Sequence, residues 1–183
     1  MQYSSSERRL LCAKLVRSVP KFGSLRAMLD RFDLDLLNLV QRDDSRTADS
    51  LAREVPLSPS AIARRLRRLR ADGWIARTTA LLSPKLTQRR LRALVLIQLS
   101  EHCNQPAKAA LEKLLVGAPQ VQFCYEIAGP HDFVALFDCA DMSEFNDVAN
   151  ALLASSTAVR RYETHFVKRE VKFAPFVELT ETG

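Results

Sequence analysis

The chain has 183 residues, of which 47% are hydrophobic and 26% charged, and its formal net charge is +6. This length suggests one or two domains with packed cores. The longest apolar runs, such as residues 93–97, fall far short of the roughly 20 residues that a membrane-spanning helix needs. No secretory signal follows Met1, so we expect a cytoplasmic protein without membrane spans.

Four cysteines are present and none form a C-x-x-C pair. They are Cys12, Cys103, Cys124 and Cys139. A zinc site needs convergent ligands that this spacing does not supply. We therefore expect reduced thiols, no metal and no cofactor.

Positive charge is concentrated toward the N-terminus. Residues 1–28 carry six basic and one acidic residue, 29–85 carry eleven and eight, and 86–183 carry ten and twelve. Such asymmetry indicates nucleic-acid contact at one end and another task at the other. We predict three parts with these boundaries: a basic extension (1–28), a DNA-binding domain (29–85), and a sensing and self-association domain (86–183).

Three helices are predicted in the second part. Apolar residues at 29, 32, 36, 39 and 40 have helical spacing, and residues 47–54 form a short second helix with Thr47 as N-cap. A third helix begins after Ser58, with Pro59 at its first position, and ends at Gly73. Three helices with a tight turn predict a helix-turn-helix.

The following residues are β-prone. Residues 74–82 predict a small hairpin, or wing, beside the helices, and 86–92 predict a basic linker. Beyond the linker we expect strands at 92–100, 121–128, 133–139 and 159–172, with helices at 106–115 and 143–153. This order, βαββαβ, predicts an α+β protein whose second domain is ferredoxin-like, with an antiparallel sheet.

The third helix is the strongest functional signal. Ile62, Leu66 and Leu69 form its inward stripe, while small residues at its start and arginines beyond them face outward. Arginine forks reach guanine edges and phosphates in the major groove. The predicted DNA-binding residues are Ser58, Ser60, Ala61, Arg64, Arg65, Arg67 and Arg68. The alternative is a solvated charged face, but such faces usually mix signs, and no acid follows these arginines before Asp72.

At this point the residues resemble the Lrp/AsnC family of transcription regulators. The resemblance covers residues 29–172 in collinear order and rests on "LDRFDLDLL", "LSPSAIARR", "GWI", "YEIAGPHDFVALF" and "VRRYETHFVKREVK". It implies a winged helix-turn-helix, a sensing domain that binds a small effector such as an amino acid, and dimers formed through the sensing-domain sheets that assemble further. Pro56, the glycine-free Thr87–Arg89 and the pair Pro130-His131 depart from the family pattern.

The resemblance also favours an effector site at the turn containing Gly129, His131 and Asp132, which we expect to join two central strands. Asp132 would hold the ligand's ammonium group; the alternative is that Gly129 and Asp132 serve only the turn. No nucleophile, base and orienting group share a motif, so we expect no enzyme.

Two other functions remain open. Sirohaem decarboxylases resemble the same two-domain plan, and a DNA-architectural protein would bind with little sequence preference. Residues 1–28 are either a basic arm that grips DNA, or translation begins at Met28.

Overall fold

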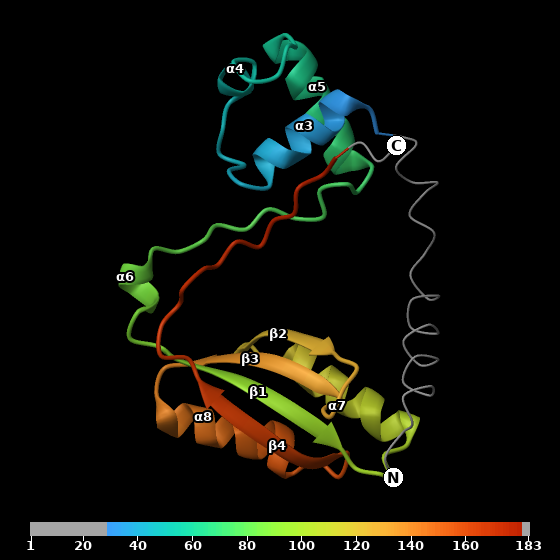
Figure 1. Ribbon diagram of the computed structural model, residues 1–183, viewed down its shortest axis with the longest axis vertical. Coiled ribbons are helices and arrows are strands. Elements are labelled where there is room, and N and C mark those ends of the chain that lie inside the picture. The colour runs from blue at the N-terminus through green and yellow to red at the C-terminus, as the bar shows by residue number, and fades with distance from the viewer. Residues whose placement is uncertain (1–28, 181–183) are drawn as a thin grey trace. The chain divides into compact units, whose positions relative to one another are not determined.

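The computed structural model describes residues 29–180, which form two compact units. The helical unit contains residues 29–81 together with the C-terminal segment 173–180, and the sheet unit contains residues 82–172 (Figure 1). The predicted basic extension, 1–28, lies outside the described residues.

Three helices form the helical unit: α3 (Arg31–Val40), α4 (Ala48–Leu51) and α5 (Pro59–Ala71). Thr47 is the N-cap of α4, and its hydroxyl accepts from Ser50 N at 3.2 Å. Ser58 is the N-cap of α5, and its hydroxyl accepts from Ala61 N at 3.3 Å. At the end of α5, Gly73 takes a left-handed conformation with φ +78°, as the sequence predicted.

The inward faces of these helices make one core. The predicted stripe of α5, Ile62, Leu66 and Leu69, is buried in it. The other buried members are Leu36, Leu37, Val40, Leu51 and Val55. Trp74, Ile75 and, from the C-terminal segment, Leu179 pack against its rim.

The predicted hairpin over residues 74–82 is not formed. This segment pairs with no strand among the described residues, and from Ala76 to Ser83 it has no regular structure. It contains none of the Asn-Gly or Gly-X pairs that close a tight hairpin, and residues 76–83 present exposed side chains. The predicted linker, 86–92, is also partly ordered, since it overlaps the end of the short helix α6 (Pro84–Thr87) and the beginning of β1 at Leu91.

The sheet unit has the predicted βαββαβ order. Its elements are β1 (Leu91–Leu99), α7 (Gln105–Gly117), β2 (Val121–Glu126), β3 (Phe133–Cys139), α8 (Met142–Ala149), the π-helical turn η1 (Asn150–Ala154) and β4 (Val159–Phe166). The strands lie in the order β2-β3-β1-β4, and each neighbouring pair is antiparallel (Figure 1). The predicted α+β fold with a ferredoxin-like sheet is therefore confirmed.

Helices α7 and α8 cover the same sheet face. Alternate residues of β1 and β3, such as Val95 and Phe137, are buried with Leu111 and Leu115 of α7 and Phe145 of α8. The intervening residues face away from the helices. Strand β4 ends at Phe166, before the predicted Lys172. No helix in residues 29–180 is long and apolar enough to span a membrane.

Candidate DNA interface and effector loop

The exposed face of α5 begins with small side chains. Ser58 and Ser60 are exposed at its N-terminus, with their hydroxyls 3.1 Å apart, and Ala61 is half-buried beside them. Arg64 and Arg67 follow at intervals that keep them on this outer face, and both are exposed. Because these side chains are small, this end of α5 can approach a partner closely.

The other arginines of α5 are held by acids from outside the helix. Arg65 Nη1 lies 2.7 Å from Asp30 Oδ2 and 2.8 Å from Asp33 Oδ1. Arg68 is paired with the second oxygen of Asp33. These contacts join α5 to the first turn of α3.

A further contact joins α5 to the turn after α3, where Arg70 Nη2 lies 2.6 Å from Asp44 Oδ1. Asp44 Oδ2 accepts a hydrogen bond from the Thr78 hydroxyl at 2.8 Å, which also ties down part of the extended segment. Arg70 therefore has a local structural partner.

The acidic group of Asp33 is almost fully buried, with 1% of the side chain exposed. Hydrogen bonds to Asp33 and then to Asp30 raise the pKa of Arg65 further above its ordinary value. Burial disfavours the charge of Asp30, but hydrogen bonds from Asp33 N and Arg65 hold its pKa below the ordinary 3.8. Asp30 and Arg65 are therefore both charged at neutral pH.

The predicted arginines thus divide into two sets. Arg64 and Arg67 make no ion pair or side-chain hydrogen bond within residues 29–180, whereas Arg65 and Arg68 are engaged with α3. The sequence argument that these arginines lack acidic neighbours holds only along their own helix. No local pattern signalled Asp30 and Asp33, since they precede α5 by about thirty positions in the sequence.

Asp132 closes the turn between β2 and β3. Its Oδ2 accepts from Leu99 N at 2.7 Å, its own N–H donates to Ile97 O, and its carbonyl accepts from Ile127 N, both at 2.8 Å. One carboxylate oxygen is therefore engaged in the fold. A Cβ atom at Gly129 would have no other atom within 4 Å. Steric crowding therefore does not require glycine at this position.

The turn's place in the sheet differs from the expectation. Strand β2 is an edge strand and only β3 is central, so the turn joins an edge strand to a central one. The hydrophobic pattern of residues 121–128 did not distinguish these two positions.

His131 lies beside the turn and is largely buried, with 12% of its side chain exposed. Its Nε2 has no hydrogen-bond partner among the described residues and lies 3.5 Å from Glu163 Oε1 of β4. Arg161 Nη2 lies 3.6 Å from the same oxygen. Sequence reasoning missed Glu163, because only the pairing of β1 with both neighbours brings β4 near this turn.

The sheet face opposite the helices carries an apolar patch. It consists of Leu94 and Leu96 of β1, Val134 and Leu136 of β3, and Phe123 and Tyr125 of β2. The rings of Phe123 and Tyr125 stack at 5.1 Å, and Tyr125 is 62% exposed. Arg161, Glu163 and His165 of β4 border the patch.

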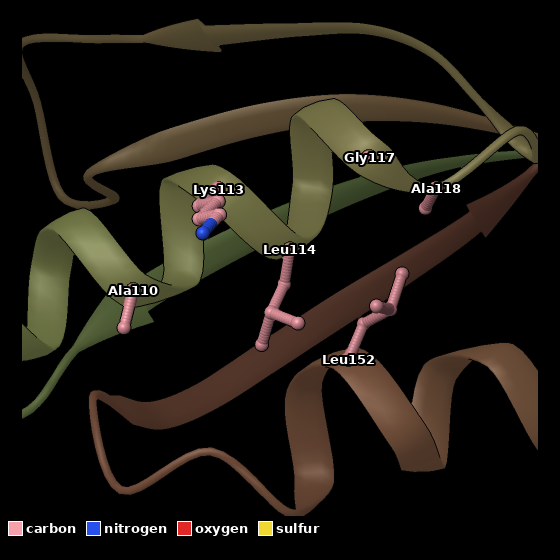
Figure 2. Close-up of a pocket in the computed structure, with 6 residues that line it drawn as sticks. All are labelled: Ala110, Lys113, Leu114, Gly117, Ala118 and Leu152. Carbon is pink, nitrogen blue, oxygen red and sulfur yellow. The ribbon is translucent and has the colours of Figure 1, made fainter.

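A second apolar feature lies on the helical side of the sheet unit. An open groove runs between α7 and η1, where Leu114 and Leu152 point toward each other (Figure 2). Its other lining residues are Ala110, Lys113, Gly117 and Ala118. Its lining holds no carboxylate, so it offers no anchor for an ammonium group.

The cysteines in the described part of the chain are unpaired thiols. Cys139 is buried, and this burial raises the pKa of its thiol; burial raises the pKa of the Cys124 thiol as well. No group of three or more His, Cys, Asp or Glu side chains within residues 29–180 is placed to hold a metal ion.

Comparisons with known proteins agree with this architecture. A winged helix-turn-helix DNA-binding family matches residues 29–76, and the Lrp/AsnC ligand-binding domain matches residues 92–175. The leucine-responsive regulatory protein of Salmonella typhimurium is 31% identical over 147 residues, which cover 79% of this chain and 87% of that protein. The glutamate uptake regulatory protein of Zymomonas mobilis is 30% identical over 155 residues, covering 85% and 93%.

Solved structures show the same two-part fold. A transcriptional regulator from Neisseria meningitidis, crystallised with L-Met, superimposes with a TM-score of 0.74 at 27% identity, covering 84% of this chain and 97% of that one. An AsnC family regulator from Agrobacterium tumefaciens has a TM-score of 0.72 at 23% identity, covering 81% and 96%. The chain belongs to the Lrp/AsnC family of DNA-binding transcriptional regulators, which respond to small effectors.

Proposed function

We propose that this regulator contacts duplex DNA through the outer face of α5, with Arg64 and Arg67 as its principal cationic contacts. It acts as a cytoplasmic homodimer and as a regulator without catalytic activity. The observation that carries the proposal is the division of the arginines: Arg65 and Arg68 are neutralised by α3, while Arg64 and Arg67 are exposed and unpaired among the described residues.

The N-terminal turn of α5 completes this interface. The helix can enter the major groove because Ser58, Ser60 and Ala61 are small. The serine hydroxyls and the backbone groups of this turn suit phosphate oxygens. Arg65 and Arg68 fix the helix on α3 and add positive charge behind the contact surface. An unpaired arginine keeps all five donors for base edges or phosphates.

The test is the Arg64→Ala/Arg67→Ala double variant. We expect specific binding to weaken by about 2 kcal/mol or more, roughly 30-fold, since a good base contact contributes about 1–3 kcal/mol. The protein's salt dependence should also become less steep if either arginine binds phosphate. Footprinting and titration at several salt concentrations measure both effects.

Two controls make this test specific. The Lys113→Ala/Arg169→Ala variant removes the same charge from the sheet unit and should bind DNA almost normally. Arg65→Ala should lower the stability of the helical unit, because Asp33 then loses one of its two partners. Unchanged footprints in the folded Arg64/Arg67 variant would refute the interface.

The effector site proposed for Gly129, His131 and Asp132 rests on polar groups that the fold leaves available. Asp132 uses Oδ2 for Leu99 N, so Oδ1 is the oxygen for a ligand's ammonium group. Beside it lie the Glu163 carboxylate and the buried His131 Nε2, which has no hydrogen-bond partner among the described residues. A small amino acid suits this set, and structural similarity to a regulator crystallised with L-Met supports the same class.

Calorimetry with the twenty amino acids tests this site. Asp132→Asn retains an oxygen for Leu99 N while removing the charge, so we expect the turn to persist and ligand binding to weaken by about tenfold or more. Equal binding by wild type and the variant would leave Asp132 as a turn residue only.

The apolar sheet patch supports self-association. Its six apolar side chains are contiguous and partly exposed, with Tyr125 the most exposed of them, and soluble monomers rarely leave large apolar patches uncovered. We expect Leu96→Glu to shift the full-length protein toward monomer in analytical ultracentrifugation, because a charge at the centre of such an interface is left without a partner. Leu114→Glu, in the groove on the helical side, is the matched control and should leave the assembly unchanged.

A further inference from the structure

The C-terminal segment makes a specific contact with α3 inside the helical unit. Asn38 Nδ2 donates to Leu179 O at 2.7 Å, and Asn38 Oδ1 accepts from Leu179 N at 2.9 Å. One turn away, Gln41 Nε2 donates to Val177 O and Gln41 Oε1 accepts from Val177 N at 3.0 Å. Two side-chain amides therefore each bind both backbone groups of one residue.

This pattern matches two periodicities. Asn38 and Gln41 are neighbours on one face of a helix, being three residues apart. Val177 and Leu179 are two residues apart and so present their backbone groups on the same edge of an extended chain. A primary amide carries both a donor and an acceptor. The amides of Asn38 and Gln41 therefore satisfy the backbone N–H and C=O groups of the segment as a neighbouring strand would.

Side chains reinforce this backbone contact. Leu179 packs against the core of the helical unit, and the guanidinium of Arg42 lies 4.6 Å from the centre of the Phe176 ring. Asn38 and Gln41 are also joined by a 3.1 Å hydrogen bond, which orients the two amides together. The contact thus combines four hydrogen bonds between side-chain amides and the backbone with apolar packing of Leu179 at one end and the cation–π contact of Phe176 at the other.

The path of the chain gives this contact a consequence. Strand β4 of the sheet unit ends at Phe166, and the segment reaches α3 at Phe176. These ten steps extend to at most about 35 Å. The linker runs from Thr78, which is hydrogen-bonded to Asp44, to Leu91 of β1, and its thirteen steps extend to at most about 46 Å. A seated C-terminal segment therefore shortens the distance over which α3 can move away from the end of β4.

We propose that residues 176–179 act as a strap that fastens α3 to the end of β4, and so restrain the DNA-binding helices by a second connection besides the linker. The surface of α3 formed by Asn38, Gln41 and Arg42 is its docking site. Because β4 also carries Glu163 beside His131, the strap connects the helical unit to the strand that borders the proposed effector loop.

Hydrogen exchange on the full-length protein tests the docking. The amides of Val177 and Leu179 donate to α3, whereas that of Glu178 has no such acceptor among the described residues. We expect exchange at Val177 and Leu179 to be at least about tenfold slower than at Glu178. The protection should disappear in Asn38→Ala/Gln41→Ala but persist in Gln88→Ala/Asn146→Ala, which removes two exposed amides elsewhere. Equally fast exchange at all three positions in the wild type would overturn the proposal.

Two proline variants test the restraint without changing α3. Val177→Pro removes the N–H that Gln41 accepts, while Glu178→Pro removes one that α3 does not use. The probes are a duplex selected by the wild type from random sequences, and the same duplex with five base pairs inserted between its half-sites, which turns one half-site by about half a helical turn.

A restrained dimer should lose about tenfold or more of its affinity on this insertion, and so should Glu178→Pro, whereas Val177→Pro should lose less than about threefold. Affinity for a single half-site should be equal in all three proteins. An equal insertion penalty for both proline variants would overturn the restraint. If no protein bound DNA, the DNA interface would have failed instead, and hydrogen exchange would still decide whether the strap is seated.

Discussion

The helical unit and the sheet unit use charged side chains differently. In the helical unit eight buried hydrophobic residues form the core, and Arg65, Arg68 and Asp33 hold α5 against α3 beside it. In the sheet unit thirteen buried hydrophobic residues form the core, and its buried acid, Asp138, pairs with Arg90 where the ladder between β1 and β3 already joins the two segments. A small core thus relies on charge for the placement of its helices, and an arginine there is not automatically available to a ligand.

The largest effect is expected in the apolar core of the sheet unit. Phe137 is fully buried and meets the edge of Phe145 with 6.0 Å between ring centres. Phe137→Ala should lower the free energy of unfolding by about 3–5 kcal/mol, through lost burial and a cavity. Urea denaturation followed by the labelling rate of buried Cys139 reports this unit.

Val116→Ala is the matched control for that measurement. Its side chain is 85% exposed, so the substitution should change stability by less than about 0.5 kcal/mol. A loss below about 1 kcal/mol for Phe137→Ala would show that the sheet unit does not depend on its apolar core as proposed.

In the helical unit the corresponding test is Asp33→Ala. It leaves Arg65 and Arg68 without their shared buried partner, and we expect a loss of about 2–3 kcal/mol, less than for a fully buried pair because both guanidinium groups keep some contact with water. Trp74, the chain's single tryptophan, packs against this core and reports its unfolding by fluorescence.

Asp35→Ala provides the comparison on the same helix. Asp35 is half exposed and lies 3.9 Å from Arg31, so its removal should cost less than about 1 kcal/mol. If the two variants were equally stable, the ion pairs of α5 would be surface contacts of little structural weight, and Arg65 and Arg68 would again be candidates for DNA contact.

What was predictable from sequence followed from local chemistry. Ser58 and Gly73 bounded α5 because a hydroxyl cap and a left-handed glycine act within a few residues. The division of the arginines was not predictable, because Asp33 meets Arg65 only after two helices pack. Strand β4 was overestimated because residues 167–172 are β-prone in sequence, yet they lie beyond the ladder with β1. The strap left no signal, since Asn38 and Gln41 resemble ordinary polar surface residues.

A smaller effect is expected at the start of α5. Ser58→Ala removes the acceptor for Ala61 N and should cost about 1 kcal/mol of stability in the Trp74 fluorescence assay. Ser60→Ala, which removes only the contact between two hydroxyls, should cost less. Similar losses for the two would mean that α5 is held by its packing and ion pairs rather than by its cap.

The smallest expected effect is a pH dependence that isolates the charge of Asp30. Burial opposes its ionisation, but hydrogen bonds from Asp33 N and Arg65 lower its pKa in the folded protein below 3.8. The folded state therefore binds this proton less readily than the unfolded state does. The stabilisation is present above the unfolded pKa, near about 4, and is lost as the pH falls through the lower folded pKa.

Asp30→Asn separates charge from capping, since asparagine still offers an oxygen to Asp33 N. Wild type should be the more stable protein at pH 7 by at most about 1 kcal/mol, because the Asp30 side chain is half exposed and water screens its pair with Arg65. That difference should shrink as the pH falls from about 5 to about 3. A difference that stayed constant over this interval would assign the role of Asp30 to its cap alone and leave Asp33 as the acid that holds Arg65.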